Sequence, residues 1–349
     1  MSLSMDAKSP SPASYEYLLE VRELVVEFAV RERSGVKGAK VQAVSGLSFD
    51  IAPGETLGVV GETGCGKSTM ARAVMQAARP KSGEVIFEGQ DLTKLSNKDL
   101  QEVRKHLQII FQDPFSSVDP RWRVKNIIEE PLVIHGAGTP EEREKRVAEL
   151  LELVGLDIKI HGNRRPRELS GGQCQRVAIA RALALSPQLM VCDEAVSSLD
   201  VSIQAQILNL LIRLRKELGL SYLFIAHDLA VVKYLSDRVA VMYLGKFCEI
   251  GPSELLYRQP LHPYTTALLD AIPNTDGHPS KHHDELGVEA PSPINPPSGC
   301  RYRTRCPRAQ EVCALEEPQM RFLAPRHGVA CHFPNTNDTD DTNTASQPD

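Results

Sequence analysis

The sequence predicts an α/β fold organised around one phosphate-binding loop, and three observations carry this prediction. Residues 61–69 form a complete G-x-x-x-x-G-K-S pattern, Gly61-Glu62-Thr63-Gly64-Cys65-Gly66-Lys67-Ser68-Thr69, which we call the phosphate loop. The short, β-branched segment 56–60 before it is typical of a buried strand. Residues 68–78 after it favour a helix. Strand, glycine-rich loop and helix together are the context in which this pattern cradles phosphate.

Each part of the phosphate loop has a chemical reason. The glycines let successive backbone N–H groups turn toward an anion, and the helix N-terminus adds a partial positive charge. Lys67 is expected to reach the β- and γ-phosphates, and the Ser68 hydroxyl to hold Mg²⁺. The alternative is an ordinary glycine-rich turn beside a lysine, but the flanking strand and helix favour a nucleoside triphosphate. We therefore expect all nine residues to bind ATP. Cys65, close to a helix N-terminus, is expected to have a lowered thiol pKa.

Length and composition limit the possible functions. The 349 residues suffice for one large domain with an appendage, or for two domains. Lys and Arg total 40 against 45 Asp and Glu, and the net charge of −5 argues against nonspecific nucleic-acid binding. The sequence has no apolar run long enough to cross a bilayer and no signal-peptide pattern at its N-terminus. We expect a cytosolic chain whose membrane role comes through a partner.

The first hundred residues predict a β-rich edge. Residues 1–16 are rich in Ser and Pro and are expected to be disordered. Strands are expected at 18–28 and 41–51, on either side of a polar loop at 31–40. Phe28 ends the first strand, where its ring either stacks on adenine or belongs to the core. Further elements are a hairpin strand at 82–89 and a helix at 99–105.

Gln112 and His227 each follow a predicted strand, at 107–111 and 221–226. Ligands of open α/β sheets bind beyond the carboxyl ends of strands. His227 is a candidate γ-phosphate sensor because neutral imidazole can donate to a phosphate oxygen, although a lone His is more often structural. Gln112 alone could be a surface residue.

Two consecutive carboxylates end the apolar strand 189–194. In a phosphate-loop sheet, Asp193 could hold Mg²⁺ through water and Glu194 could orient the attacking water. Two solvated acids are the alternative, which fits poorly after such an apolar run. A helix is expected to follow at 201–218.

Predicted helices at 124–134, 140–154 and 173–184 make residues 113–178 a helical insertion in the strand-rich frame. The last helix is preceded by Leu169-Ser170-Gly171-Gly172-Gln173. A serine and paired glycines at a helix start can form a second anion site. Such a turn is more often only a helix cap.

Six motifs, GETGCGKST, Gln112, LSGGQ, LMVCDE, SSLD and His227, together resemble an ABC transporter nucleotide-binding domain in order and spacing. The resemblance covers residues 18–333 and implies a P-loop NTPase with a RecA-like core, a β-rich edge and an inserted α-helical subdomain. It implies that Glu194 is the catalytic glutamate, Asp200 the D-loop aspartate and His227 the switch histidine. Gln112 would be the Q-loop glutamine, serving catalysis and Mg²⁺, and Phe28 falls at the adenine-stacking position. ATP would lie between this phosphate loop and residues 169–173 of a partner chain.

Segments such as CDEAVSSLDVSIQAQILNLL and PLHPYTTALLDAIP resemble the second, F-type ATPase subunit of dipeptide/oligopeptide importers. This resemblance implies a heterodimer with a second ATPase, two membrane permeases and an extracytoplasmic binding protein, at the cytoplasmic face of the membrane and without nucleic acid. Members of the family also import nickel, glutathione or cell-wall peptides. The rival class is a soluble ABC ATPase of translation, DNA repair or cluster assembly. Translation types usually carry two sets of motifs, whereas this chain has one.

The end of the chain is cysteine-rich. Residues 17–273 are the expected nucleotide-binding domain, 274–299 a linker, 300–333 an extension and 334–349 a disordered tail. Cys300, Cys306, Cys313 and Cys331 contain none of the close pairs typical of zinc sites, and four spread cysteines suit an iron–sulfur cluster better. Zinc and metal-free thiols are the alternatives. The importer ATPases carry a similar tail and some hold a [4Fe–4S] cluster, so the resemblance implies one here. Because it lies far along the chain from the phosphate loop, we expect a structural or docking role.

Overall fold

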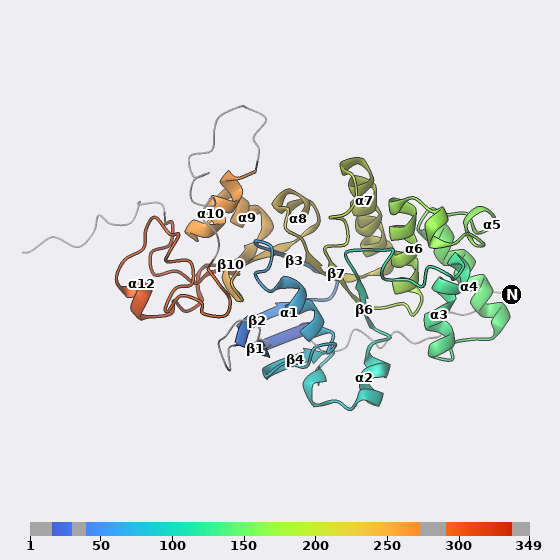
Figure 1. Cartoon of the computed structure of the whole chain (residues 1–349), viewed down its shortest axis with the longest axis horizontal. Coiled ribbons are helices and arrows are strands. Elements are labelled where there is room, and N and C mark those ends of the chain that lie inside the picture. Colours follow the sequence, from blue (N-terminus) through green and yellow to red (C-terminus); the bar gives the residue numbers. More distant parts are fainter. Residues whose placement is uncertain (1–15, 30–39, 273–290, 337–349) are drawn as a thin grey trace, which may run out of the picture.

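The structure is a computed structural model that describes residues 16–29, 40–272 and 291–336 (Figure 1). The expectations for residues 1–15, 31–39, 274–290 and 337–349 lie outside these described residues.

The smaller of two sheets is antiparallel and comes from the N-terminal part of the chain. Its order is β2-β1-β4-β5. The strands are β1 (Leu19–Ala29), β2 (Lys40–Ile51), β4 (Ser82–Phe87) and β5 (Gln90–Asp91). The strands predicted at 18–28, 41–51 and 82–89 are therefore confirmed as β1, β2 and β4.

The larger sheet has the order β11-β12-β10-β9-β3-β8-β7-β6 and is parallel from β9 to β6. Its parallel strands are β9 (Arg238–Tyr243), β3 (Thr56–Val60), β8 (Ser221–Ile225), β7 (Leu189–Asp193) and β6 (Leu107–Ile110). Every residue of β3, β7 and β8 is buried. Alternate side chains enter two cores: Cys192 packs toward the helices, whereas Val191 packs on the side of the smaller sheet. Parallel strands read as unbroken apolar runs because both faces of their sheet are covered.

Helices cover both faces of the larger sheet. α1 (Lys67–Val74) lies between the sheets and contacts β1, β2 and β7. Its end differs from the prediction of a helix to residue 78, because the chain adopts a positive φ of 52° at Gln76. The other helices before residue 272 are α2 (Asn97–Val103), α3 (Val124–Ile134), α4 (Pro140–Leu153), α5 (Ile158–His161), α6 (Gly171–Leu183), α7 (Val201–Leu218), α8 (Leu229–Leu235), α9 (Ser253–Arg258) and α10 (Pro263–Asp270), with short 3-10 turns η2 (Leu92–Lys94) and η3 (Pro166–Glu168).

Helices α3 to α6 lie together at one end of the molecule, and the cysteine-rich segment around α12 (Val312–Leu315) lies at the opposite end (Figure 1). The helices predicted at 124–134, 140–154, 173–184 and 201–218 are confirmed to within two residues. α4 begins with a capping box between Thr139 and Glu142 and with Pro140 in its first turn, which fixes its start. None of the helices in the described ranges has the length and apolar composition that a membrane span requires.

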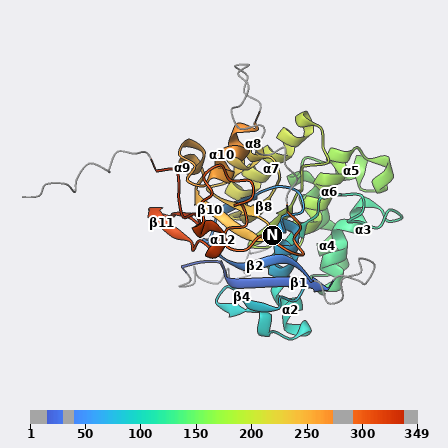
Figure 2. The ribbon, with the colours of Figure 1, turned by 60° about the vertical axis from the view of Figure 1, so that its left-hand side comes forward.

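The cysteine-rich tail, residues 291–336, continues the larger sheet. β10 (Lys246–Pro252) pairs with β9 on one side and with β12 (His327–Val329) on the other, and β11 (Arg321–Ala324) pairs with β12. Figure 2 shows β10 and β11 in the same part of the molecule. His327 and Glu249, both buried, bring Nε2 and Oε1 within 2.7 Å across the β10–β12 pair. Through β12 and β11, the tail therefore extends the larger sheet beyond β10.

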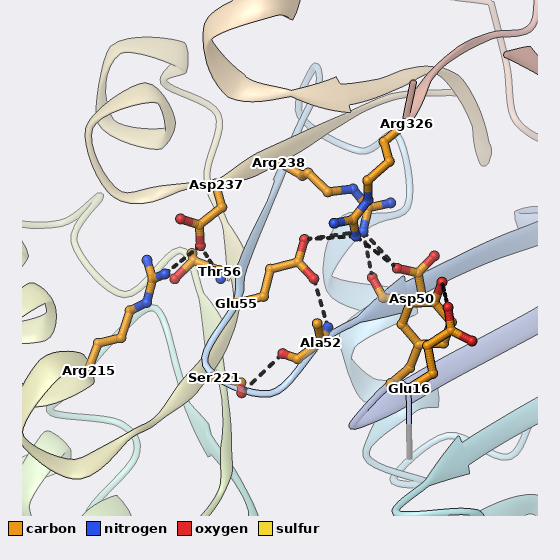
Figure 3. A network of polar contacts seen from close by, with 11 residues as sticks. Glu16, Asp50, Ala52, Glu55, Thr56, Arg215, Ser221, Asp237, Arg238 and Arg326 are labelled. Atoms are coloured by element: carbon orange, nitrogen blue, oxygen red, sulfur yellow. Dashed lines mark hydrogen bonds and ion pairs between the residues drawn. The ribbon is translucent and has the colours of Figure 1, made fainter. Parts of the chain in front are cut away.

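Arginines from two elements meet at the junction of both sheets (Figure 3). Arg238 of β9 lies 2.8 Å from a carboxylate oxygen of Asp50 and 3.2 Å from one of Glu55. Arg326, in the turn between β11 and β12, lies 3.5 Å and 3.6 Å from the same two oxygens. Because Asp50 belongs to β2 and Glu55 precedes β3, these ion pairs tie the tail to both sheets.

Candidate nucleotide site

The phosphate loop leaves the end of β3 and enters α1 at Lys67. Gly66, the N-cap, has φ of 111°, and a Cβ there would lie 2.0 Å from the carbonyl oxygen of Ala43. A Cβ at Gly61 would lie 2.0 Å from the carbonyl oxygen of Met242. Only glycine fits at these two positions, so the loop is pressed against β2 and β9.

Lys67 lies across the loop that precedes it. Its side chain is buried, and Nζ donates to the carbonyl oxygens of Gly61 at 2.6 Å and Glu62 at 3.0 Å. The ammonium group is thus held above the turn formed by the glycines.

Ser68 and Asp193 bring two oxygen ligands together. Ser68 Oγ donates a 2.7 Å hydrogen bond to Asp193 Oδ1. Asp193 is buried at the end of β7, and burial raises the pKa of its carboxyl group, while the bond from Ser68 acts in the opposite direction. Hydroxyl and carboxylate oxygens are ligands that Mg²⁺ prefers, so this pair fits a Mg²⁺ site.

Glu194 occupies a strained backbone position directly after β7. Its φ is 51°, a left-handed conformation that costs a non-glycine residue about 1 kcal/mol or more. Its N–H donates to the carbonyl of Ile225 on β8 at 3.0 Å. Its carboxylate oxygen lies 3.8 Å from His227 Nδ1. The turn at Glu194 therefore directs its side chain away from that of Asp193 and toward the predicted sensor histidine.

One cavity of about 340 Å³ brings many of the predicted residues together. Its walls include Phe28, Lys67, Ser68, Gln112 and Glu194. The side chain of Phe28 is 46% exposed, which excludes the alternative of a core residue. The carbonyl of Gln112 accepts a 3.2 Å bond from Ser198 Oγ, which links the segment after β6 to the segment after β7.

Residues 169–173 and Asp200 do not line this cavity. Ser170 and Gln173 form the capping box of α6, with bonds of 3.3 Å and 3.0 Å between each backbone N–H and the other's side chain. Asp200 caps α7 by accepting from the N–H of Ile203 at 3.0 Å, and the bond from Ser202 Oγ lowers the pKa of its carboxyl group. Within one chain these motifs are therefore separate from the phosphate loop.

The predicted low pKa of Cys65 is wrong. The side chain is 5% exposed, and burial raises the pKa of its thiol despite the opposing charge of Lys67. Loss of solvation outweighs the helix N-terminus here, because the thiolate is the form that burial disfavours.

The four tail cysteines come from separate segments, with Cys313 in α12, and the other three influence the pKa of Cys331. The N–H of Cys300 donates to the carbonyl of Cys313 at 2.8 Å. Burial raises the pKa of Cys331 to about 11, and the charges of the other three cysteines add to the effect. Within the described ranges, however, no three His, Cys, Asp or Glu side chains are arranged to hold a metal ion. The predicted cluster and the zinc alternative therefore find no support in this arrangement.

The tail contacts the phosphate loop, although the two segments lie far apart along the chain. Arg305 of the tail donates to the carboxylate of Glu62 at 3.0 Å, and the N–H of Glu62 donates to the hydroxyl of Tyr264 at 3.1 Å. Arg305 and Tyr264 carry no local sequence signal for this contact, because they lie 243 and 202 residues from Glu62 and belong to no motif.

Comparison with known proteins identifies the family. Residues 44–197 match the ABC transporter family, and residues 248–313 match the C-terminal region of oligopeptide/dipeptide transporters. The oligopeptide transport ATP-binding protein AppF of Bacillus subtilis is 49% identical over 92% of this chain and 98% of its own length. OppF of Haemophilus influenzae, with the same description, is 50% identical over 90% of this chain and 97% of its own length.

Solved structures agree with this assignment. A dimeric ATP-binding cassette in a post-hydrolysis state with ADP and Pi has a TM-score of 0.60 and 28% identity, covering 67% of this chain and 98% of that chain. The predicted P-loop α/β fold is confirmed. The chain belongs to the ATP-binding proteins of the oligopeptide and dipeptide ABC transporters.

Proposed function

We propose that this chain is the ATP-hydrolysing subunit of an importer that carries dipeptides or oligopeptides across the cytoplasmic membrane. The meeting of Lys67, Ser68, Gln112 and Glu194 around one cavity carries the ATPase part of the proposal. The transport part is supported by oligopeptide transport ATP-binding proteins that are about 50% identical over most of both chains.

ATP is proposed to bind with its base on Phe28 and its phosphates in the phosphate loop. Lys67 would contact the β- and γ-phosphates, and Ser68, Asp193 and Gln112 would hold Mg²⁺, which would neutralise phosphate charge. Glu194 orients the attacking water, and His227 contacts the γ-phosphate. Positioning and charge stabilisation supply the catalysis.

The second half of each site is proposed to come from another chain. Residues 169–173 and Asp200 lie outside the cavity of their own chain, so they are free to complete the site of a partner ATPase. The proposed assembly is a heterodimer of ATPases on the cytoplasmic face of the membrane. It drives two permeases that receive substrate from an extracytoplasmic binding protein.

We also propose that Cys300, Cys306, Cys313 and Cys331 hold a [4Fe–4S] cluster, with zinc as the alternative. The proposal rests on the thiolate chemistry of such clusters and on the presence of four cysteines within one tail segment. A cluster is larger than a single ion, so its ligands lie further apart than those of a mononuclear site.

Purification of the intact membrane complex tests the function. In liposomes, peptide with the binding protein should stimulate ATP hydrolysis and drive uptake of labelled peptide, and Lys67→Ala in the same complex is the control without ATP binding. Stimulation by nickel or glutathione but not by peptide would change the substrate class. Copurification with ribosomes or DNA, and not with permeases, would overturn the transport role.

A further inference from the structure

The tail segment 300–306 packs directly against the phosphate loop. Arg305 Nη1 donates a 3.0 Å bond to Glu62 Oε2, between residues 243 positions apart. The Arg305 side chain is 1% exposed and that of Glu62 is 26% exposed. An ion pair with one partner fully withdrawn from water is screened far less than a surface pair.

Glu62 is the second residue of the phosphate loop, and three of its polar groups form hydrogen bonds. Its carboxylate accepts from Arg305, its N–H donates to the Tyr264 hydroxyl, and its carbonyl accepts from Lys67 Nζ. The peptide unit that receives the Lys67 ammonium is therefore fixed by a residue of the tail. A displacement of Glu62 would move the group against which Lys67 rests.

Arg305 is itself held by aromatic residues. Its guanidinium lies 5.7 Å from the ring centre of Tyr243 and 5.9 Å from that of Tyr302, and it donates to the Tyr243 hydroxyl at 3.3 Å. The rings of Tyr243, Tyr264 and Tyr302 have centres 4.7–5.2 Å apart. Cation–π contacts strengthen when they are desolvated, so this cluster holds the guanidinium in the position where it bonds Glu62.

A second arginine of the same segment supports the wall of the cavity. Arg301 donates to Gln42 Oε1 at 2.8 Å, to Ser45 Oγ at 3.0 Å and to the carbonyl of Leu244. Gln42 and Leu244 line the cavity that also contains Lys67. Segment 300–306 thus contacts the site from two sides.

The charge of Glu62 explains why this contact matters. A loop that receives a polyphosphate carries a carboxylate of its own, and two like charges close together repel. Arg305 cancels this charge within the loop. We propose that Arg305 is a positioning residue that, through Glu62, holds the phosphate loop and offsets its carboxylate, so that ATP affinity depends on the tail.

This inference rests on ATP binding at Lys67, and its test is separate from peptide transport. In the intact complex, Arg305→Gln should raise both the dissociation constant of a fluorescent ATP analogue and the KM for ATP by about tenfold, with little change in kcat. Arg305→Lys keeps the charge and should restore most of the affinity. Glu62→Gln combined with Arg305→Gln should bind within about twofold of Glu62→Gln alone, because the repelling carboxylate is gone.

Arg303→Gln is the matched control, because the Arg303 side chain, two residues away, bonds Ser298. It should leave ATP affinity unchanged. A merely structural role of Arg305 predicts that its loss weakens binding equally with Glu62 or Gln at position 62. That result, or unchanged affinity in Arg305→Gln, would overturn the proposal. If Arg305→Gln alone does not assemble, the comparison of Glu62→Gln with the double variant decides. Absence of peptide uptake by the complex, with the dissociation constant and KM for ATP as predicted, would contradict only the proposed transport function.

Discussion

Ser68 Oγ donates a 2.7 Å hydrogen bond to Asp193 Oδ1, which joins the start of α1 to the end of β7 across 125 residues. Asp193 is held at the phosphate loop by this bond, and the left-handed turn at Glu194 sends the next carboxylate toward His227. Two consecutive acids therefore have different neighbours, Ser68 for Asp193 and His227 for Glu194.

Glu194→Gln should bind ATP normally but lose at least about 100-fold in turnover, because it removes the carboxylate that we propose orients the attacking water. Asp193 and Ser68 are untouched, so the proposed Mg²⁺ site is preserved. Single-turnover hydrolysis in the assembled complex measures the effect, and Lys67→Ala, which should lose binding itself, is the comparison. Wild-type turnover in Glu194→Gln would refute the assignment.

Ser170→Arg should impair the ATP site built on the partner's phosphate loop, because Ser170 caps α6 away from the cavity of its own chain. Nucleotide occupancy of each site can be read by crosslinking a labelled ATP analogue to each subunit. Loss confined to the Lys67 site would contradict the composite arrangement.

Alkylation of Cys65 should be slow at neutral pH and accelerate as the pH rises, because burial raises the pKa of its thiol and little thiolate is present. Saturating ATP should slow it further. Mass spectrometry of the peptide that contains residue 65 gives the rate, with Cys65→Ser as the blank. Equal rates with and without ATP would argue against nucleotide in this loop.

Protein purified without oxygen should be brown and contain iron and sulfide in equal amounts if the tail holds a [4Fe–4S] cluster. Cys306→Ser should remove the colour. Stoichiometric zinc without iron would replace the cluster by the zinc alternative, and protein free of both metals would leave only thiols.

The stability of the chain should fall as the pH decreases from about 6.5 to about 4 because of His262. This residue is buried, and burial lowers the pKa of its imidazole from 6.5 to about 4, against the smaller opposite effect of Glu249. The unfolded chain then binds the proton first. Neutral His262 therefore makes its full contribution to the free energy of unfolding above about pH 6.5. About 3 kcal/mol of this free energy is lost by pH 4 through this one group.

Urea unfolding of the full chain at several pH values measures this slope. His262→Asn is the matched variant, because its amide oxygen can still accept from the N–H of Tyr264 at the start of α10. It should show a shallower fall between these pH values. An identical slope in both proteins would exclude His262 as the source.

Local sequence determined the framework of the site. An apolar strand, a glycine-rich loop and a helix are specified by neighbouring residues, so β3, the phosphate loop and α1 could be located without tertiary information. The polar residues after β6, β7 and β8 could be placed at one edge because parallel strands end at the same side of a sheet. The order and spacing of these residues and motifs along the chain then matched those of a known family.

Tertiary structure alone decided how the tail relates to that framework. The three-residue strand β12 is too short to carry a pattern, and it exists because β10 offers it a partner. The ion pair of Arg305 with Glu62 and the burial of Cys65 depend on packing between segments up to 243 residues apart. Solvation and ion-pair energies are set by what surrounds a group in space. For that reason the sequence identified the residues of the phosphate loop, while only the fold revealed that Arg305 of the tail pairs with Glu62 of this loop.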